Sequence, residues 1–150
     1  MAKSINDAES QAIYDQVIDY GRSLGIVCYD TDGLKPETPS NANPAINAII
    51  INLNTPNKRH LPYEAAHEIE HVVLEHHGVC TFDGRDVSGQ EGEANRGAID
   101  LLVPMYFEDR PQESADVYQF MDALAIPGTM RDYVEEAVCT FYHQSKWIFY

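Results

Sequence analysis

At residues 61–78 the chain reads LPYEAAHEIEHVVLEHHG, and this stretch predicts a helix over residues 62–77. Its apolar residues recur at helical spacing. Pro62 suits the first turn of a helix, where the N–H that proline lacks has no intrahelical partner. Gly78 suits the position after the last turn, and His76 and His77 suit the negative end of the helix dipole.

Inside this predicted helix, residues 67–71 form the pattern HExxH. His67 and His71 project from one face about 40° apart, so that both imidazoles can bind one metal ion. Glu68 is rotated by about 100° from His67 and borders the same face. That position suits a carboxylate that holds a water beside the ion rather than the ion itself.

A catalytic zinc ion takes three protein ligands and keeps one open position. Residues 91–98 supply two candidates for the third ligand, Glu91 and Glu93. They lie about 200° apart on a regular helix, so both cannot point at one ion. We favour Glu91, because Asn95 lies one turn further on and its amide oxygen can accept the outer N–H of a ligating histidine. Glu93 then becomes a charge on the helix surface.

Two smaller features complete the predicted site. The small residues Ala94 and Ala98 allow the helix that carries Glu91 to approach the HExxH helix closely. The histidines outside the pattern are interpreted as surface or capping residues and not as ligands; they are His60, His76, His77 and His143.

The rest of the chain predicts one α+β domain over residues 1–150. A helix over 8–24 has Asp7 as its N-cap and stops at Gly25. Strands over 26–29 and 46–53 flank a loop at 30–45 that contains three prolines. Further helices are predicted over 89–103, ended by Pro104, over 112–125 and over 128–145. We expect a small antiparallel sheet of two or three strands against four or five helices.

Composition and charge restrict the class of protein. The 150 residues carry ten basic and 24 acidic side chains, a net charge of −14, and residues 61–150 hold five of the basic and 17 of the acidic ones. This acidity disfavours direct binding of nucleic acid and favours a metal cation or a basic protein, although it also serves solubility alone. Three features predict a cytoplasmic protein without a membrane segment. The three cysteines are widely spaced, the N-terminus does not resemble a secretory signal, and no long apolar run is present.

Two blocks of this sequence resemble the ImmA/IrrE family of zinc metallopeptidases. Residues 64–71, EAAHEIEH, are similar to that family's AHElgH block, and residues 91–104, EGEANRGAIDLLVP, to its ExEANxFAxxLLMP block. The resemblance covers most of residues 8–140. It implies a zincin-like fold, with His67, His71 and Glu91 as zinc ligands and Glu68 as the catalytic base. It also implies a protein substrate, often a helix-turn-helix repressor of a phage, a mobile element or a stress response.

The chain departs from the family pattern at two positions, since Glu70 replaces a glycine and Gly97 replaces a bulky aromatic residue. We hypothesise that the two changes compensate each other in packing. Glu70 is also a candidate for a substrate contact, for raising the basicity of Glu68, or for marking a member that no longer cleaves peptides. Tyr63, one turn before His67, is a candidate oxyanion contact, with a half-buried structural role as its alternative.

Two functions from different classes therefore follow. The first is a zinc-dependent endopeptidase. The second is a binding module that keeps the scaffold and captures a regulatory protein without cutting it. A purely structural metal site is a weaker third interpretation, because structural zinc sites are usually closed by four protein ligands. Oligomeric state is not indicated by the sequence.

Overall fold

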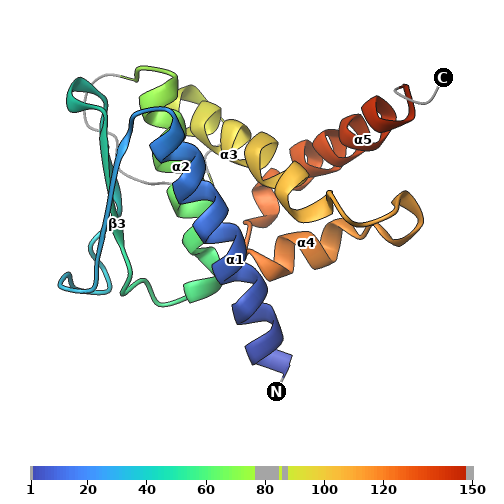
Figure 1. The fold of residues 1–150 in the computed structure, drawn as a ribbon, viewed down its shortest axis with the longest axis horizontal. Coiled ribbons are helices and arrows are strands. Elements are labelled where there is room, and N and C mark those ends of the chain that lie inside the picture. The colour runs from blue at the N-terminus through green and yellow to red at the C-terminus, as the bar shows by residue number, and fades with distance from the viewer. Residues whose placement is uncertain (1, 77–84, 86–87, 148–150) are drawn as a thin grey trace.

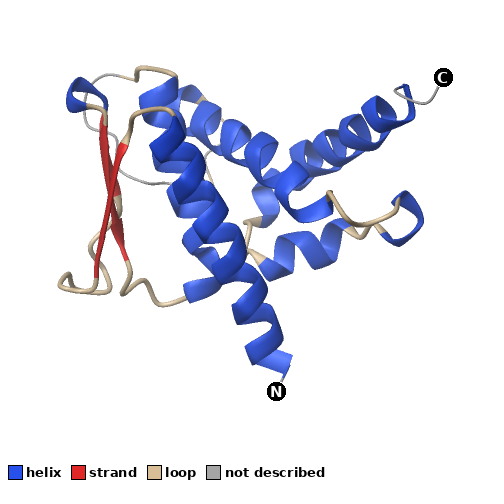
Figure 2. Cartoon of the chain, in the orientation of Figure 1, coloured by secondary structure: helices blue, strands red, loops and turns tan. Residues whose placement is uncertain are grey.

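The computed structural model describes residues 2–76, 85 and 88–147, which form a mixed α+β arrangement. A short sheet stands on one side of the helices (Figure 2). The described strands are β1 (Val27–Thr31), β2 (Asn41–Asn43) and β3 (Ala48–Asn52). The described helices are α1 (Ala2–Ser23), α2 (Leu61–Val73), α3 (Gly89–Phe107), α4 (Val117–Ala123) and α5 (Arg131–Trp147).

The sheet is mixed, and the predicted antiparallel sheet is wrong in this respect. β3 lies in the centre and pairs in parallel with β1 and antiparallel with β2. The chain reverses after β1, forms β2 inside the segment predicted as a loop, and reverses again so that β3 enters between the other two strands. The Asn-Ala-Asn sequence of β2 has low strand propensity, which explains why the pattern of residues did not show it.

The helix α2 occupies the centre of the fold, packed against α1, α3, β2 and β3 (Figure 1). Its neighbours approach it closely. A Cβ atom at Gly21 of α1 would lie 2.8 Å from Ile69 Cδ1 and 2.9 Å from Cys28 Sγ, so any larger residue would force these side chains to shift where α1 crosses α2 and the sheet. On the sheet side, Cys28, Ala42 and Ile49 form one buried row across the three strands.

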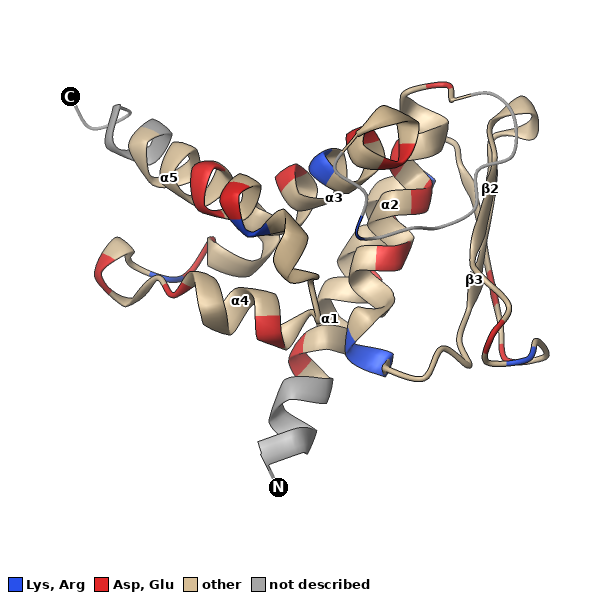
Figure 3. Cartoon of the chain, turned by 180° about the vertical axis from the view of Figure 1, so that it is seen from behind, with Lys and Arg blue, Asp and Glu red and all other residues tan. Residues whose placement is uncertain are grey.

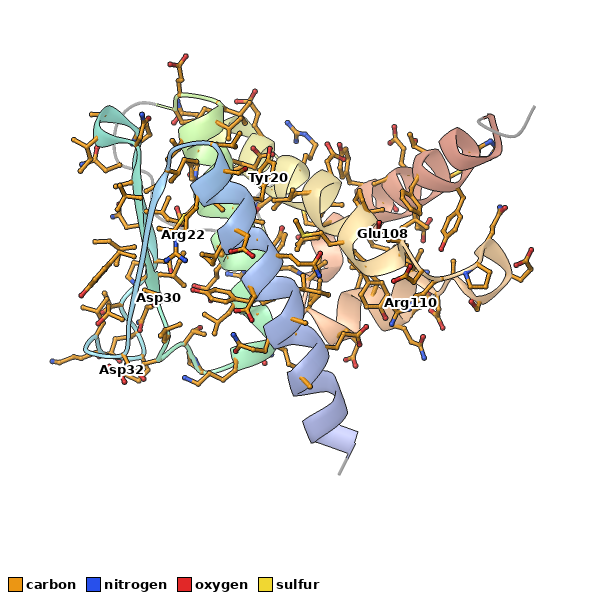
Figure 4. All side chains as sticks on the ribbon, in the orientation of Figure 1. Tyr20, Arg22, Asp30, Asp32, Glu108 and Arg110 are labelled. Atoms are coloured by element: carbon orange, nitrogen blue, oxygen red, sulfur yellow. The ribbon has the colours of Figure 1, made fainter. Side chains whose placement is uncertain are left out.

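Polar contacts hold the sheet and the segment between β1 and β2 in place. Arg22 reaches from α1 toward β1 (Figure 4) and donates to the carbonyl of Cys28 at 3.2 Å. The amide of Asn52 donates to the carbonyls of Lys35 and Thr38, both at 2.8 Å. The hydroxyl of Ser40 accepts from the backbone N–H of Asn52 and donates to Glu64 of α2. The segment is therefore tied both to the sheet and to the helix that carries HExxH.

Several predicted helix boundaries change in the structure. α1 begins at Ala2, so Asp7 is inside the helix and not its N-cap, whereas Gly25 ends it with φ 82° as expected. α2 ends at Val73, so Gly78 is not its cap. The predicted helix over 112–125 contains a short 3-10 turn and then α4, and the predicted start at 128 is a 3-10 turn before α5. His77, Gly78, Cys80 and the apolar C-terminus 148–150 lie outside the described residues.

The helix α3 continues through Pro104 to Phe107, contrary to the prediction that Pro104 ends it. Tertiary contacts of its last turn outweigh the hydrogen bond that proline cannot donate. Phe107 is fully buried, with its ring 5.3 Å from that of Phe120 on α4. Just beyond the helix, the guanidinium of Arg110 lies 3.9 Å from the ring centre of Tyr106, in the region where Figure 4 labels it.

Candidate metal centre

The two histidines of HExxH face the same point, as their spacing on α2 requires. The Nε2 atoms of His67 and His71 lie 3.0 Å apart, and both side chains have no exposed surface. Pro62 occupies the first turn of α2, as predicted. Helical geometry therefore brings two imidazole nitrogens to one buried position.

A carboxylate from α3 completes this group, and it belongs to Glu91. Its Oε1 lies 3.0 Å from His67 Nε2, and its Oε2 lies 2.9 Å from His71 Nε2. The residues Ala94 and Ala98 are fully buried where α3 packs on α2, which agrees with the close approach expected from their size. The ligand atoms of His67, His71 and Glu91 all lie within 4.8 Å of one another, so the three residues could hold a metal ion.

Asn95 fixes the orientation of the first histidine. Its Oδ1 lies 2.6 Å from His67 Nδ1, so the predicted contact between this amide and a ligating histidine is present. An amide oxygen can only accept, which places the proton of the His67 ring on Nδ1. Nε2 of His67 then carries a lone pair directed at the carboxylate of Glu91.

His76 fixes the second histidine, and its prediction as a surface or capping residue is wrong. The ring is buried, and its Nδ1 lies 2.8 Å from His71 Nδ1. Its Nε2 lies 3.1 Å from Oε1 of Glu93. A carboxylate can only accept, so His76 donates through Nε2, accepts through Nδ1 and thereby takes the Nδ1–H of His71.

The end of α2 brings His76 back over the site. Glu75 takes a left-handed conformation with φ 54°, its N–H donates to the carbonyl of Val72, and the N–H of His76 donates to the carbonyl of His71. These two bonds define a Schellman motif, which places the residue after the left-handed one against the residue five positions earlier. Glycine or asparagine usually signals such a turn, and glutamate at 75 does not, so the sequence carried no signal for it.

The donor set fits a cation. With Nδ1 protonated on both rings, the lone pairs of two Nε2 atoms face each other and the oxygens of Glu91 at about 3 Å. Burial, followed by repulsion from His67, lowers the pKa of His71 to about 4, so its ring is neutral near pH 7. Neutral imidazole nitrogens and a carboxylate are the ligands that zinc takes in catalytic sites, and a cation removes the repulsion between their lone pairs.

Glu68 is the most unusual group beside this site. It is fully buried, and neither of its carboxylate oxygens has a hydrogen-bond partner among the described residues. Burial raises the pKa of Glu68 well above its usual range, and the charges of Glu91 and Glu64 raise it further. A buried carboxyl group without a partner is costly to the fold, and such groups are concentrated at functional sites.

The other predicted site residues lie on the same helix. Tyr63 is fully buried, with its ring centre 5.4 Å from that of His60, and its role at the oxyanion stays a prediction. Glu70 lies against Gly97 of α3, where a Cβ atom would be only 2.7 Å from its Cδ. The contact that the packing hypothesis requires is therefore present, while the proposed substrate contact of Glu70 stays a prediction.

Figure 3 marks acidic residues along α2, α3, α4 and α5, with fewer basic residues between them. Of the three candidate ligands only Glu91 reaches the surface, with a side chain 19% exposed. No described helix combines the length and apolar character needed to cross a membrane. Comparison of the chain with protein-family models, curated proteins and solved structures finds no match.

Proposed function

We propose that this chain is a zinc-dependent metallo-endopeptidase. One observation carries the proposal: the Nε2 atoms of His67 and His71 and the carboxylate of Glu91 converge beside a buried Glu68 whose carboxylate oxygens have no partner among the described residues. Ligands alone would suit a structural ion. The adjacent carboxylate adds a base, and a metal ion with a base beside it is the minimum equipment for hydrolysis. The resemblance to the ImmA/IrrE family supports the same interpretation.

In this proposal His67, His71 and Glu91 hold the ion, and Asn95 orients the ring of His67. When bound, zinc supplies Lewis-acid polarisation of the scissile carbonyl and makes water more acidic. Glu68 accepts the proton of the attacking water on a carboxylate oxygen and donates it to the amine nitrogen of the leaving chain. Burial raises the pKa of the Glu68 carboxyl group well above its usual range, and a raised pKa suits both transfers.

For the substrate, we propose a regulatory protein such as a helix-turn-helix repressor in the cytoplasm. The three candidate ligands and Glu68 all lie within residues 61–150. This part of the chain holds 17 acidic and five basic side chains. DNA-binding regulators carry basic surfaces. An acidic surface attracts them over distances up to about one Debye length. Among the described cysteines, Cys28 and Cys139 are free thiols, which supports a reducing compartment.

Metal analysis and cleavage assays with three variants test the proposal. The purified protein should contain about one zinc per chain and cut members of a peptide library that is rich in Lys and Arg. Glu68→Gln should keep the zinc and lose cleavage, and His67→Ala should lose both. Glu108→Gln removes a charge from the exposed end of α3 and should change neither. Unchanged cleavage by Glu68→Gln would overturn the peptidase function.

A second candidate function is a binding module that captures a regulator without cutting it. The observation that favours it is the burial of the chemistry: His67, Glu68 and His71 have no exposed surface, so a peptide bond reaches them only if the protein rearranges. The two functions differ in the fate of the partner. When a regulator captured by the Glu68→Gln variant is incubated with the unsubstituted protein, fragments support the peptidase and an intact complex supports the binding module.

A further inference from the structure

The chain places a histidine and a carboxylate behind His71 in a line that leads away from the metal ligands. His71 Nδ1 lies 2.8 Å from His76 Nδ1, and His76 Nε2 lies 3.1 Å from Glu93 Oε1. The rings of His71 and His76 meet edge to face, with their centres 5.0 Å apart. His76 is 6% exposed, whereas the side chain of Glu93 is 52% exposed, so the line runs from the buried site to the surface.

We propose that His76 and Glu93 are positioning residues that hold His71 in its Nδ1–H tautomer and thereby strengthen the binding of the metal ion. The carboxylate of Glu93 accepts the proton of His76 Nε2, which leaves His76 Nδ1 as an acceptor. His71 must then donate through Nδ1, and its Nε2 keeps the lone pair that a metal requires. This inference rests on the metal site of the proposed function and not on peptide cleavage.

The arrangement explains why α3 carries two glutamates and one asparagine within five residues. Glu91 and Glu93 point in different directions from a regular helix, so only one of them can be a ligand. The imidazole of His76 spans the remaining gap, so that Glu93 acts on the site through His71. One helix therefore supplies a ligand, an amide that orients His67, and a carboxylate that orients His71 through an intermediate ring.

The groups that orient the two histidines differ in charge, so they should differ in their effect on metal binding. Asn95 is a neutral acceptor for His67, whereas Glu93 is an anion that acts through the polarisable ring of His76. A carboxylate behind a ligating histidine makes that histidine a stronger donor. We therefore expect Glu93 to strengthen metal binding beyond what a neutral acceptor would provide.

Metal affinity in the full-length protein tests the proposal. Zn²⁺ affinity is measured by competition with a chromophoric chelator, and folding of each variant is checked by circular dichroism. His76→Ala should weaken binding about 10- to 100-fold. Glu93→Ala should weaken Zn²⁺ binding by a smaller factor than His76→Ala does. His76→Gln should retain most of the affinity that His76→Ala loses, because the amide oxygen of glutamine can accept from His71 Nδ1. Glu108→Gln removes an equal charge from the exposed end of α3 and should leave the affinity unchanged.

A double-mutant cycle separates the proposed line from a general effect of negative charge. If Glu93 acts through His76, Glu93→Ala should have no further effect on Zn²⁺ affinity in the His76→Ala background. If it acts only through space, it should weaken binding equally in both backgrounds, and the proposal is wrong. Where His76→Ala fails to fold, the cycle is lost, and the effect of Glu93→Ala on the tautomer of His71 tests the proposal, because Glu93 is half exposed.

The tautomer of His71 is read by ¹⁵N NMR of the histidine side chains in the metal-free Glu91→Ala variant, where no carboxylate competes for a proton on Nε2. This variant should show His71 protonated at Nδ1, and adding Glu93→Ala should shift the ring toward a mixture of tautomers. A His71 ring protonated at Nε2 in the Glu91→Ala variant would overturn the proposal. Failure of the unsubstituted protein to bind Zn²⁺ would instead overturn the proposed function, and equal Zn²⁺ affinity in all variants would overturn this inference alone.

Discussion

The packing of Glu70 against Gly97 predicts that substitutions at these two positions are energetically coupled. A methyl group at position 97 would lie 2.7 Å from Cδ and 2.8 Å from Cγ of Glu70, and closer still to its Oε1. Folded proteins do not hold a Cβ atom at such distances from another heavy atom, so the Glu70 side chain must leave its place. Removing that side chain first, by Glu70→Ala, removes the conflict.

The magnitude follows from two opposing effects of Gly97→Ala. Alanine is favoured over glycine inside a helix by about 1 kcal/mol. Overpacking against a side chain that must move costs about 1–3 kcal/mol. In the unsubstituted protein Gly97→Ala should therefore lower the free energy of unfolding by about 0–2 kcal/mol. In the Glu70→Ala background it should raise this free energy by about 1 kcal/mol, which is a coupling of about 1–3 kcal/mol.

Urea unfolding of the two single variants, the double variant and the unsubstituted protein measures this coupling. A chelator is present throughout, because a bound metal ion would stabilise the folded state by an amount that depends on its concentration. Gly128→Ala serves as the matched control, since a Cβ atom there meets nothing within 4 Å. If the effects of Glu70→Ala and Gly97→Ala add to within about 0.5 kcal/mol, the two side chains do not compete for space and the compensation hypothesis is wrong.

Three further predictions concern the site. In metal-free protein, Glu68→Gln should raise the free energy of unfolding at pH 7 by at least about 1 kcal/mol, because it removes a buried carboxylate without a partner. This gain in the free energy of unfolding should vanish below pH 4.5, where Glu68 is protonated in both the folded and the unfolded chain. Equal stability of the variant and the unsubstituted protein in urea at pH 7 would contradict this prediction. His71, whose pKa falls from 6.5 to about 4 on folding, should make metal-free protein lose stability as the pH drops through that interval, and His71→Asn should reduce the slope in thermal melts. Asn95→Ala should weaken Zn²⁺ binding about 10- to 100-fold in chelator competition, and an unchanged affinity would show that His67 does not need this acceptor.

Local patterns predicted those parts of the fold that depend on neighbours in the chain. Helical spacing was enough to place His67 and His71 together, and Gly25 was enough to end α1, because a left-handed residue there costs glycine nothing. The contact between Glu70 and Gly97 was expected only from the resemblance, because the chain departs from the resembled family's pattern at these two positions.

Other parts depended on packing that no local pattern reveals. The strand β2 exists because β3 offers it a pairing edge, although its own residues disfavour strands. α3 passes through Pro104 because Phe107 is buried beyond it. Glu75 adopts a left-handed conformation that its residue type does not favour, and the turn it makes is what buries His76.

The amino-acid order alone established a helix with two imidazoles on one face and a carboxyl group bordering that face. The reason is that a residue four places along a helix always lies one turn away. It favoured Glu91 over Glu93 through the position of Asn95, but it did not establish that α3 would bring Glu91 to the imidazoles, or that His76 would stand behind His71. Those contacts depend on how closely α3 packs on α2 and on the direction of the chain after Val73. Both are set by the burial of side chains from distant parts of the sequence, and therefore only the folded structure decides them.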